Sequence, residues 1–408
     1  MTTDGAPPPA DDPGLSDAAA GMVAAYVHVP FCRRVCPYCD FAVVAGREEL
    51  AARYVDALVA EIEATPPLDR PLDAVAFGGG TPSRLPAAAV SRVLEALRAV
   101  HRVAPDAEVS LEANPEDWTP SLAGALADAG VDRVSLGVQS FDAGVLEWLG
   151  RAHTPEQGAA AVAEARRAGF RSVSVDLIFG SPVESHASWQ QSVAAAIGLE
   201  IDHLSCYALT VEQGTPLSRS VRAGAPSPDP DAQADRYEAA WEAAGAAGLQ
   251  RYETSNAARP GHACVYNLVT WAGGEYQGFG NGAHRHVGGI RSWNVRRVDR
   301  YLERVETGGR ATSGEERLDA WGREQERLVL GLRRASGAVI GEAGSALLDS
   351  PEGARLVAAG VLAAGGERLR VARPLLGDAV ARAVLGLDPP DPSAGDGTLR
   401  AEPREPAG

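Results

Sequence analysis

Short apolar or β-branched runs alternate with helix-like patterns through the first half of the chain. The strand-like runs cover residues 24–29, 73–77, 108–112, 133–138, 172–178 and 203–209. Between them, apolar residues recur at helical spacing, as do Leu50, Tyr54, Leu58 and Ile62. Six consecutive strand–helix units predict parallel strands joined by right-handed crossovers. The spacing alone allows either a partial barrel or an open doubly wound sheet.

A region of different composition begins near residue 248. Glycine and aromatic residues are frequent there, and helical patterns follow at 322–334 and 351–364. Proline, glycine and aspartate dominate both ends of the chain, which predicts disordered tails. The expected units are a tail at 1–20, a barrel or sheet domain at 21–247, an extension that closes it at 248–310, a small helical or winged-helix-like domain at 311–386, and a tail at 387–408.

Residue types that carry chemistry fall at the ends of the predicted strands, one strand after another. In parallel α/β folds the carboxyl ends of the strands meet at one face, where functional residues gather. The segments at the six ends are 32–39, 78–82, 112–116, 137–140, Asp176 and Tyr207. Their repeated placement predicts a single cavity at that face.

The sharpest of these signals is a cysteine loop with the spacing Cys-x3-Cys-x2-Cys. Cys32, Cys36 and Cys39 lie within eight residues, and thiolates are the ligands of iron–sulfur clusters. A full cubane set is four cysteines, so three leave one iron with a vacant coordination position. The alternatives are a zinc site completed by His28 or a distant cysteine, and unligated buried thiols. The spacing favours the cluster, because zinc loops favour cysteine pairs.

The other polar residues at the strand ends are weaker signals when each is taken alone. A triple-glycine turn at 78–80 lets the backbone approach a ligand closely. Glu112 and Asp176 can anchor an amino group or ribose hydroxyls, although isolated carboxylates are more often solvated or cap helices. Cys206 and Cys264 stand alone, which is typical of small core residues. The shared location of the polar residues favours a functional interpretation.

Composition and charge limit the classes of partner. The chain of 408 residues has a formal net charge of −16, which argues against broad binding to a nucleic-acid backbone. It has no run of about 18 apolar residues, so an integral membrane protein is not expected. The acidic, proline-rich start does not have the pattern of a signal peptide. A cytoplasmic location is therefore expected.

Several motifs together resemble the coproporphyrinogen oxidase-like branch of the radical SAM superfamily. They are YVHVPFCRRVCPYCDF, FGGGTPS, SLEANPE, RVSLGVQSF, LGRAHT, SVDLIFGSP and HLSCYALTVEQGTPL. The resemblance covers nearly all of the chain between the predicted tails. It implies an incomplete (β/α)6 barrel of the TIM type with a smaller C-terminal α(+β) domain. It also implies a [4Fe–4S] cluster and S-adenosylmethionine (SAM) as cofactors, and an electron donor such as flavodoxin or ferredoxin.

The resemblance assigns expected roles to individual residues. Cys32, Cys36 and Cys39 are the expected cluster ligands, and in this superfamily the open iron is chelated by the amino and carboxylate groups of SAM. The residues expected around SAM are Tyr26, Tyr38, Gly79, Gly80, Thr81, Glu112, Gln139, Arg151, Asp176 and Ala208.

Within this branch the chain is most similar to the HemW type, whose members bind haem and pass it on as chaperones. Phe41 stands where the anaerobic coproporphyrinogen oxidases have a further cysteine, and the segment YALTVEQGTPL also resembles HemW proteins. The resemblance implies haem as bound cargo, and haem-accepting proteins such as respiratory enzymes as partners. The alternative is an active radical SAM enzyme that decarboxylates a porphyrinogen or methylates another bulky substrate. Tyr266 and Thr270, which depart from a HemW motif, keep this alternative open.

That departure concerns the haem site. HemW proteins typically carry His-Asn-x-x-Tyr-Trp, whereas here Tyr266 takes the place of the histidine, and Asn267 and Trp271 remain. Tyrosine also ligates haem iron in proteins, so these three residues in the extension at 248–310 are the expected haem site. The alternatives nearby are His262, His284 and His286.

Overall fold

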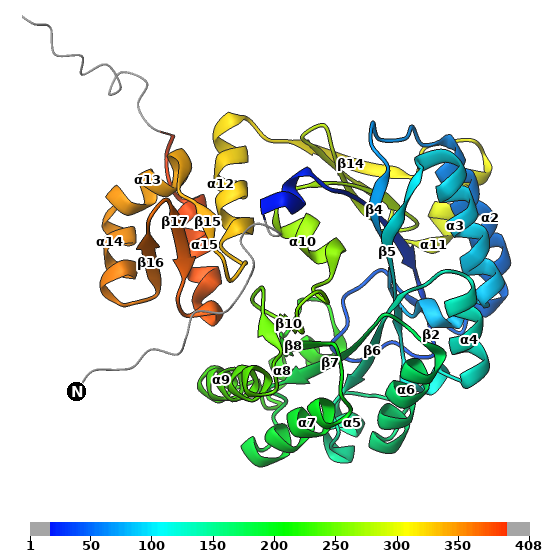
Figure 1. Cartoon of the computed structure of the whole chain (residues 1–408), viewed down its shortest axis with the longest axis horizontal. Helices are drawn as coiled ribbons and strands as arrows, with labels where there is room; N and C mark the ends of the chain where they lie inside the picture. Colours follow the sequence, from blue (N-terminus) through cyan, green and yellow to red (C-terminus); the bar gives the residue numbers. More distant parts are fainter. Residues whose placement is uncertain (1–16, 390–408) are drawn as a thin grey trace, which may run out of the picture.

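The six predicted strands form one curved parallel sheet (Figure 1). The computed structural model of the protein describes residues 17–389. Neighbouring in the sheet, in chain order, are β1 (Val23–Val29), β4 (Leu72–Gly79), β5 (Val103–Ala113), β6 (Arg133–Gln139), β7 (Ser172–Phe179) and β8 (His203–Ala208). Each pairs with the next in parallel. This confirms the incomplete (β/α)6 barrel.

Helices connect the strands, and the longer ones cover the outer face of the sheet (Figure 1). They are α2 (Ala51–Ala64), α3 (Ala87–His101), α4 (Pro120–Asp128), α5 (Ala143–Trp148), α6 (Pro155–Ala168), α7 (His186–Gly198), α8 (Pro216–Arg222) and α9 (Pro230–Ala246). Leu58 and Ile62 on α2 and Val93 on α3 are fully buried, as expected of amphipathic helices. A capping box begins α6, because Thr154 and Gln157 bond each other's backbone N–H with their side chains.

The segment after residue 249 extends the sheet at both edges. Strand β10 (Asn256–Ala258) pairs antiparallel with β8, and β9 (Gln250–Arg251) pairs antiparallel with β10. Beyond β1 lie β11 (Glu275–Phe279), β12 (His284–Val287), β13 (Ile290–Asn294) and β14 (Thr312–Arg317), with α11 (Val298–Glu306) between the last two. Among the described residues, β9 and β14 are the unpaired ends of this sheet. Residues 248–310 were expected to close the barrel. They widen its sheet instead, because the outer strands β9 and β14 do not pair with each other.

Helix α10 (Val265–Trp271) packs against the neighbouring strands β1, β4 and β11. Val265 N donates to Glu108 Oε1 (2.8 Å), and Arg133 Nη2 donates to the carbonyl oxygen of His262 (2.7 Å). Arg133 is the first residue of β6. Helix α10 thus lies toward the amino ends of the barrel strands, opposite the cysteine loop.

The chain after β14 builds a second hydrophobic core, which includes Leu328, Leu347, Leu369 and Val384. Its elements are α12 (Ala320–Gly331), β15 (Ala338–Val339), α13 (Gly341–Asp349), α14 (Pro351–Ala358), β16 (Leu362–Gly365), β17 (Arg368–Val371) and α15 (Gly377–Leu385). We refer to these elements as the C-terminal unit. It begins later than residue 311, because β14 still pairs with β13 in the main sheet. The helix–strand–helix–helix–strand–strand order supports a winged-helix-like domain, which stays a proposal.

Parts of the predicted tails belong to the fold. Residues 1–16 and 390–408 lie outside the described residues, but Ala19 is fully buried. Asp17 pairs with Arg368 of β17 over 2.7 Å, which ties the start of the described chain to the C-terminal unit. No helix between residues 17 and 389 is long and apolar enough to cross a membrane.

Candidate functional site

A cavity of about 410 Å³ lies at the carboxyl ends of the six parallel strands. We refer to it as the main cavity, and its size is typical of small-molecule and cofactor sites. Of the residues expected around a cluster and SAM, those that line it are Cys32, Cys36, Tyr38, Cys39, Gly79, Gly80, Thr81, Glu112, Gln139, Arg151, Asp176 and Ala208. Tyr26 does not line it, and its hydroxyl lies 3.2 Å from His28 Nδ1. The structure thus brings together all but one of these residues.

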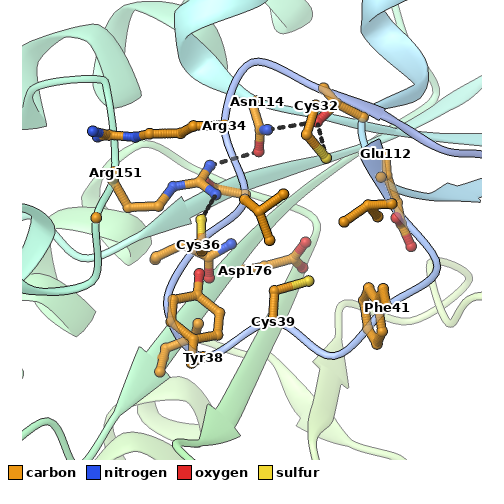
Figure 2. A pocket seen from close by; sticks show the side chains of 18 of the residues that line it. Cys32, Arg34, Cys36, Tyr38, Cys39, Phe41, Glu112, Asn114, Arg151 and Asp176 are labelled. Carbon is orange, nitrogen blue, oxygen red and sulfur yellow. Dashed lines mark hydrogen bonds between the residues drawn. The ribbon is translucent and has the colours of Figure 1, made fainter. Parts of the chain in front are cut away.

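The cysteine loop forms one wall of the main cavity (Figure 2). It leaves β2 (Phe31–Cys32) and returns through β3 (Val44–Ala45), which pairs with β2 in parallel. Cys39 N donates to Cys36 O over 3.1 Å, so these two cysteines share a tight turn. Phe41 is 62% exposed at the rim. The loop therefore presents its sulfur atoms to the cavity from a fixed backbone.

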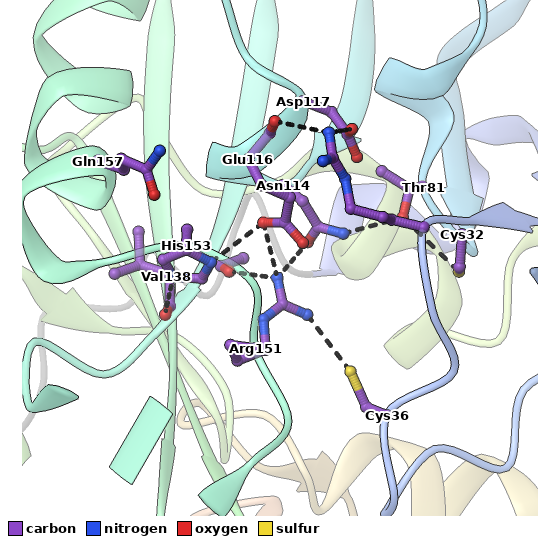
Figure 3. Close-up of polar contacts among 12 residues, drawn as sticks. Cys32, Cys36, Thr81, Asn114, Glu116, Asp117, Val138, Arg151, His153 and Gln157 are labelled. Carbon is purple, nitrogen blue, oxygen red and sulfur yellow. Dashed lines mark hydrogen bonds and ion pairs between the residues drawn. The ribbon is translucent and has the colours of Figure 1, made fainter. Parts of the chain in front are cut away.

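Two of the thiols accept hydrogen bonds from a network of polar side chains (Figure 3). Arg151 Nη1 donates to Cys36 Sγ, and Thr81 Oγ1 donates to Cys32 Sγ, each over 3.7 Å. Asn114 joins the two donors. Its Nδ2 donates to Thr81 Oγ1 (2.9 Å), and its Oδ1 accepts from Arg151 Nη2 (2.5 Å). One amide therefore positions the donors to the first two cysteines of the loop.

Glu116 supports Arg151 from behind (Figure 3). Its Oε2 lies 3.8 Å from Arg151 Nη2 and 3.0 Å from His153 Nδ1. The other ring nitrogen of His153 donates to the carbonyl oxygen of Val138 (2.9 Å). Burial acts to raise the pKa of Glu116, but the hydrogen bond with His153 and the charge of Arg151 lower it to about 2. The carboxylate is thus ionised at neutral pH and anchors the guanidinium group.

Two carboxylates near strand ends line the main cavity, Glu112, which is open to the cavity, and Asp176, which is half-buried (Figure 2). Glu112 accepts a hydrogen bond from Gly79 N (3.1 Å), and Asp176 accepts one from Ser135 Oγ (2.8 Å). Partial desolvation by the surrounding cavity wall, followed by the negative charge of Asp176, raises the pKa of Glu112 to about 7. Burial also raises the pKa of Asp176. A cationic or hydroxyl-bearing ligand would stabilise both ionised groups.

The backbone is close-packed or strained at two further cavity residues. Gly80 N donates to Val29 O (2.8 Å), and a Cβ on Gly80 would lie 2.7 Å from that same oxygen. Gln139 ends β6 with a φ of 66°, a backbone angle that residues other than glycine rarely adopt. Its buried Oε1 has no hydrogen-bond partner within residues 17–389. Such strain and unpaired polar atoms are typical of ligand sites.

Comparisons with known proteins identify the family. Residues 26–196 match the model of the Radical SAM superfamily. The protein named heme chaperone HemW from Mycobacterium tuberculosis is 41% identical, over 93% of this chain and 98% of its own. HemW from Bacillus subtilis is 33% identical, over 78% and 84% of the two chains. The chain belongs to the HemW family of radical SAM proteins.

Among solved structures, the HemW-family fold described above is similar to that of the coproporphyrinogen III oxidase HemN from Escherichia coli. The TM-score is 0.77, the identity is 23%, and the match covers 91% of this chain and 92% of the other. The likeness thus includes most of the barrel and most of the C-terminal unit. It concerns the fold alone.

Membership of the radical SAM superfamily implies a [4Fe–4S] cluster and SAM, and the residues fit both. Within residues 17–389 no three histidine, cysteine or acidic side chains converge on one ion. The three cysteines of the loop all line the main cavity, which suits a cubane, where each thiolate binds a different iron atom. Both ring nitrogens of His28 are engaged, by Tyr26 and by the carbonyl oxygen of Ala42. Burial raises the pKa of Cys32 to about 11, and bound iron would favour its thiolate instead.

The three residues expected to bind haem in HemW-type proteins lie away from the main cavity. The ring of Tyr266 stacks on Tyr26, with centroids 5.8 Å apart. Asn267 Nδ2 donates to the hydroxyl oxygen of Tyr252 over 3.3 Å. Trp271 lies beneath Arg333, whose guanidinium carbon is 4.5 Å from its ring centre. Helix α10 thus holds all three in packing contacts near the amino ends of the strands.

The histidines considered as alternatives also lie outside the main cavity. His284 stacks on Trp293, with centroids 5.8 Å apart, and His286 bonds the carbonyl oxygen of Gly274 through Nδ1 (3.1 Å). His262 uses its backbone carbonyl to hold Arg133. The rings of His284 and His286 are thus engaged within the sheet extension, whereas the buried Nδ1 of the His262 ring has no hydrogen-bond partner among the described residues.

Two residues of the site, Ser135 and His153, were not singled out in the sequence. Ser135 lines the cavity and bonds Asp176, and His153 bonds Glu116 behind it. Both stand inside motifs that carry predicted residues, RVSLGVQSF and LGRAHT. Their position within these motifs was the available signal in the sequence.

Proposed function

We propose that this protein is a haem chaperone, which binds haem and delivers it to haem-requiring proteins. The supporting observation is the 41% identity, over 93% of this chain, to a protein named heme chaperone HemW. Haem-accepting proteins such as respiratory enzymes, a flavodoxin or ferredoxin as electron donor, and a cytoplasmic location belong to the same proposal.

Three cysteines and their donors would hold the cluster. Cys32, Cys36 and Cys39 supply the thiolates, and the bound cluster would supply one electron at a time beside SAM. Arg151 and Thr81 would donate to two of the sulfur atoms. Hydrogen bonds to cluster sulfurs tune the reduction potential, so the network through Asn114 is expected to set it.

The strand ends that line the main cavity suit SAM. Glu112 and Asp176 offer carboxylates for its ammonium group and its ribose hydroxyls. Glycine at position 80 lets the turn pack directly against the backbone of Val29 and Pro30, and the unpaired Oε1 of Gln139 is available to an N–H donor. These contacts orient the ligand, because each acceptor is fixed by backbone or side-chain packing.

A haem titration of the anaerobically reconstituted protein tests the chaperone function. We expect a stoichiometric Soret band, transfer of haem to an apo-haemoprotein, and no consumption of coproporphyrinogen in the presence of SAM and reductant. A variant with all three cluster cysteines replaced by serine shows whether haem binding needs the cluster. No stoichiometric haem binding, or robust porphyrinogen decarboxylation with release of 5′-deoxyadenosine, would overturn the proposal in favour of an enzyme.

A further inference from the structure

A second cavity, of about 280 Å³, lies between the barrel and the C-terminal unit. The barrel contributes the ends of β7 and β8, and the C-terminal unit contributes α12 and the segment from β17 to α15. Tyr207, Ala208 and Thr210 line both this cavity and the main cavity. We refer to it as the interdomain cavity. The two cavities therefore adjoin at the end of β8.

Apolar side chains supply most of the interdomain cavity wall. Among them are Phe179, Val329, Leu332, Val371, Leu375 and Ala381, and the polar part of the lining includes Thr210, Thr254, Ser255 and Asp378. Leu375 is 36% exposed and Tyr207 is 42% exposed, although both stand at concave positions. Large apolar side chains that stay exposed in a concavity mark a binding surface for an apolar ligand.

Arg333 brings a positive charge to this apolar wall. Its Nη2 lies 3.9 Å from Glu253 Oε2, at the long end of an ion pair. Its buried Nε has no hydrogen-bond partner in the part of the chain that the structure describes. The ring of Trp271 lies under the guanidinium group and fixes its plane. The fork therefore retains donor capacity for a ligand carboxylate.

Tyr207 places an oxygen donor where the two cavities meet. It is the residue before the last of β8 and lines both cavities. Tyrosine oxygen is one of the protein ligands of haem iron. These features match the three chemical parts of haem. The apolar wall suits the macrocycle, the arginine suits a propionate, and the tyrosine oxygen suits the iron.

We infer that the interdomain cavity is the haem site. The macrocycle lies against the apolar wall, a propionate meets Arg333, and Tyr207 faces the iron. This inference rests on the proposed chaperone function and deepens it. It assigns Trp271 a positioning role, because that ring braces Arg333, and it gives Tyr266 a packing role under the barrel.

Haem titration of four variants tests the site. Ala381→Trp adds a bulky ring to the cavity wall at a half-buried position of α15 and is expected to weaken haem binding at least ten-fold. Tyr207→Phe removes one oxygen and is expected to change the ferric Soret and charge-transfer bands. Arg333→Gln is expected to weaken haem several-fold but to leave haem dimethyl ester unchanged, since the ester has no propionate charge. Tyr266→Phe is the control and should titrate like the wild type.

The outcomes separate this inference from the chaperone proposal. Wild type that binds no haem would overturn both. Wild type that binds haem, with Ala381→Trp and Tyr207→Phe unchanged, would overturn the site and leave the function standing. Haem binding lost in Tyr266→Phe would also overturn the site. Equal iron and sulfide content in all variants shows that a loss of haem does not come from misfolding. Comparing haem with haem dimethyl ester on Arg333→Gln tests the role of Arg333 within a single folded variant.

Discussion

Replacing Glu116 with glutamine measures how strongly the network behind the cysteine loop stabilises the fold. The Glu116 side chain is 8% exposed, and its Oε2 lies 3.0 Å from His153 Nδ1 and 3.8 Å from Arg151 Nη2. Glutamine keeps the size and shape of the side chain but carries no charge. The substitution therefore isolates the electrostatic contribution of this carboxylate.

The expected magnitude follows from the pKa of Glu116. Burial alone would raise it, but His153 and Arg151 lower it from 4.5 to about 2. One pKa unit corresponds to about 1.36 kcal/mol, so ionisation of Glu116 contributes about 3 kcal/mol to the free energy of unfolding at neutral pH. Because the pKa is lower in the folded state, this stabilisation is present above about pH 4.5. It is lost as the pH falls from there toward 2.

Denaturant unfolding of both proteins, cofactor-free and with reduced thiols, checks this at several pH values between about 7 and 3. We expect Glu116→Gln to lose about 3 kcal/mol at pH 7 and to approach the wild type as the solution is acidified. Glu303→Gln is the control. Glu303 pairs with Arg300 at the surface (3.0 Å), and its loss should cost less than about 1 kcal/mol. A loss of unfolding free energy in Glu116→Gln that does not change with pH, or that is no larger than the loss in Glu303→Gln, would refute the reasoning.

Three further predictions concern the main cavity. Alanine at any one of the three cluster cysteines should abolish the four-iron absorption and electron paramagnetic resonance signals, whereas Cys206→Ala, in the barrel core, should keep them. Gly80→Ala should weaken SAM binding in calorimetry and lower stability by about 1–3 kcal/mol, since its Cβ would meet backbone atoms at 2.7 Å. Gly124→Ala, with no atom within 4 Å on helix α4, should be neutral or raise stability by up to about 1 kcal/mol. SAM affinity should fall as the pH drops below about 7, where Glu112 gains a proton, and Glu112→Gln should lose that pH dependence.

The barrel was predictable because its strands and helices carry strong periodic signals. Strands such as β7 are buried along most of their length, and their apolar runs match the observed bounds within a few residues. Strand β5 begins five residues before its predicted start. Its first half contains Pro105 and Asp106 and pairs irregularly with β4, so it does not have a strand-like pattern.

The strands beyond β1 were not predicted, because their stability depends on distant partners. Strand β12 has the sequence His-Arg-His-Val and is only partly buried, so no apolar alternation marks it. It is ordered by pairing with β13 and by the stacking of His284 on Trp293. Helix α10 likewise depends on Glu108, which lies 157 residues before its partner Val265. Local patterns do not show such contacts.

The same distinction between local and distant contacts applies to the site. The cysteine loop is a local pattern, and its spacing alone indicated a cluster. The network of Thr81, Asn114 and Arg151 joins the segments that follow β4, β5 and α5 with the cysteine loop. Sequence placed these residues at the same face, but only the fold shows that one amide connects two of the thiols.

Different polar groups of the main cavity serve its two expected ligands: a guanidinium group donates toward the cysteine loop, and two carboxylates stand near the ends of two barrel strands. Arg151 faces the cysteine loop, whereas Glu112 and Asp176 lie on the central strands β5 and β7. Three thiolates on a cluster are anionic and are stabilised by the guanidinium group, and a sulfonium or ammonium group is stabilised by the two carboxylates. Exchanging the two ligands would place like charges side by side within the cavity, which is unfavourable. The charge pattern therefore fixes the orientation in which a cluster and a cationic cofactor meet, before any contact specific to either is made.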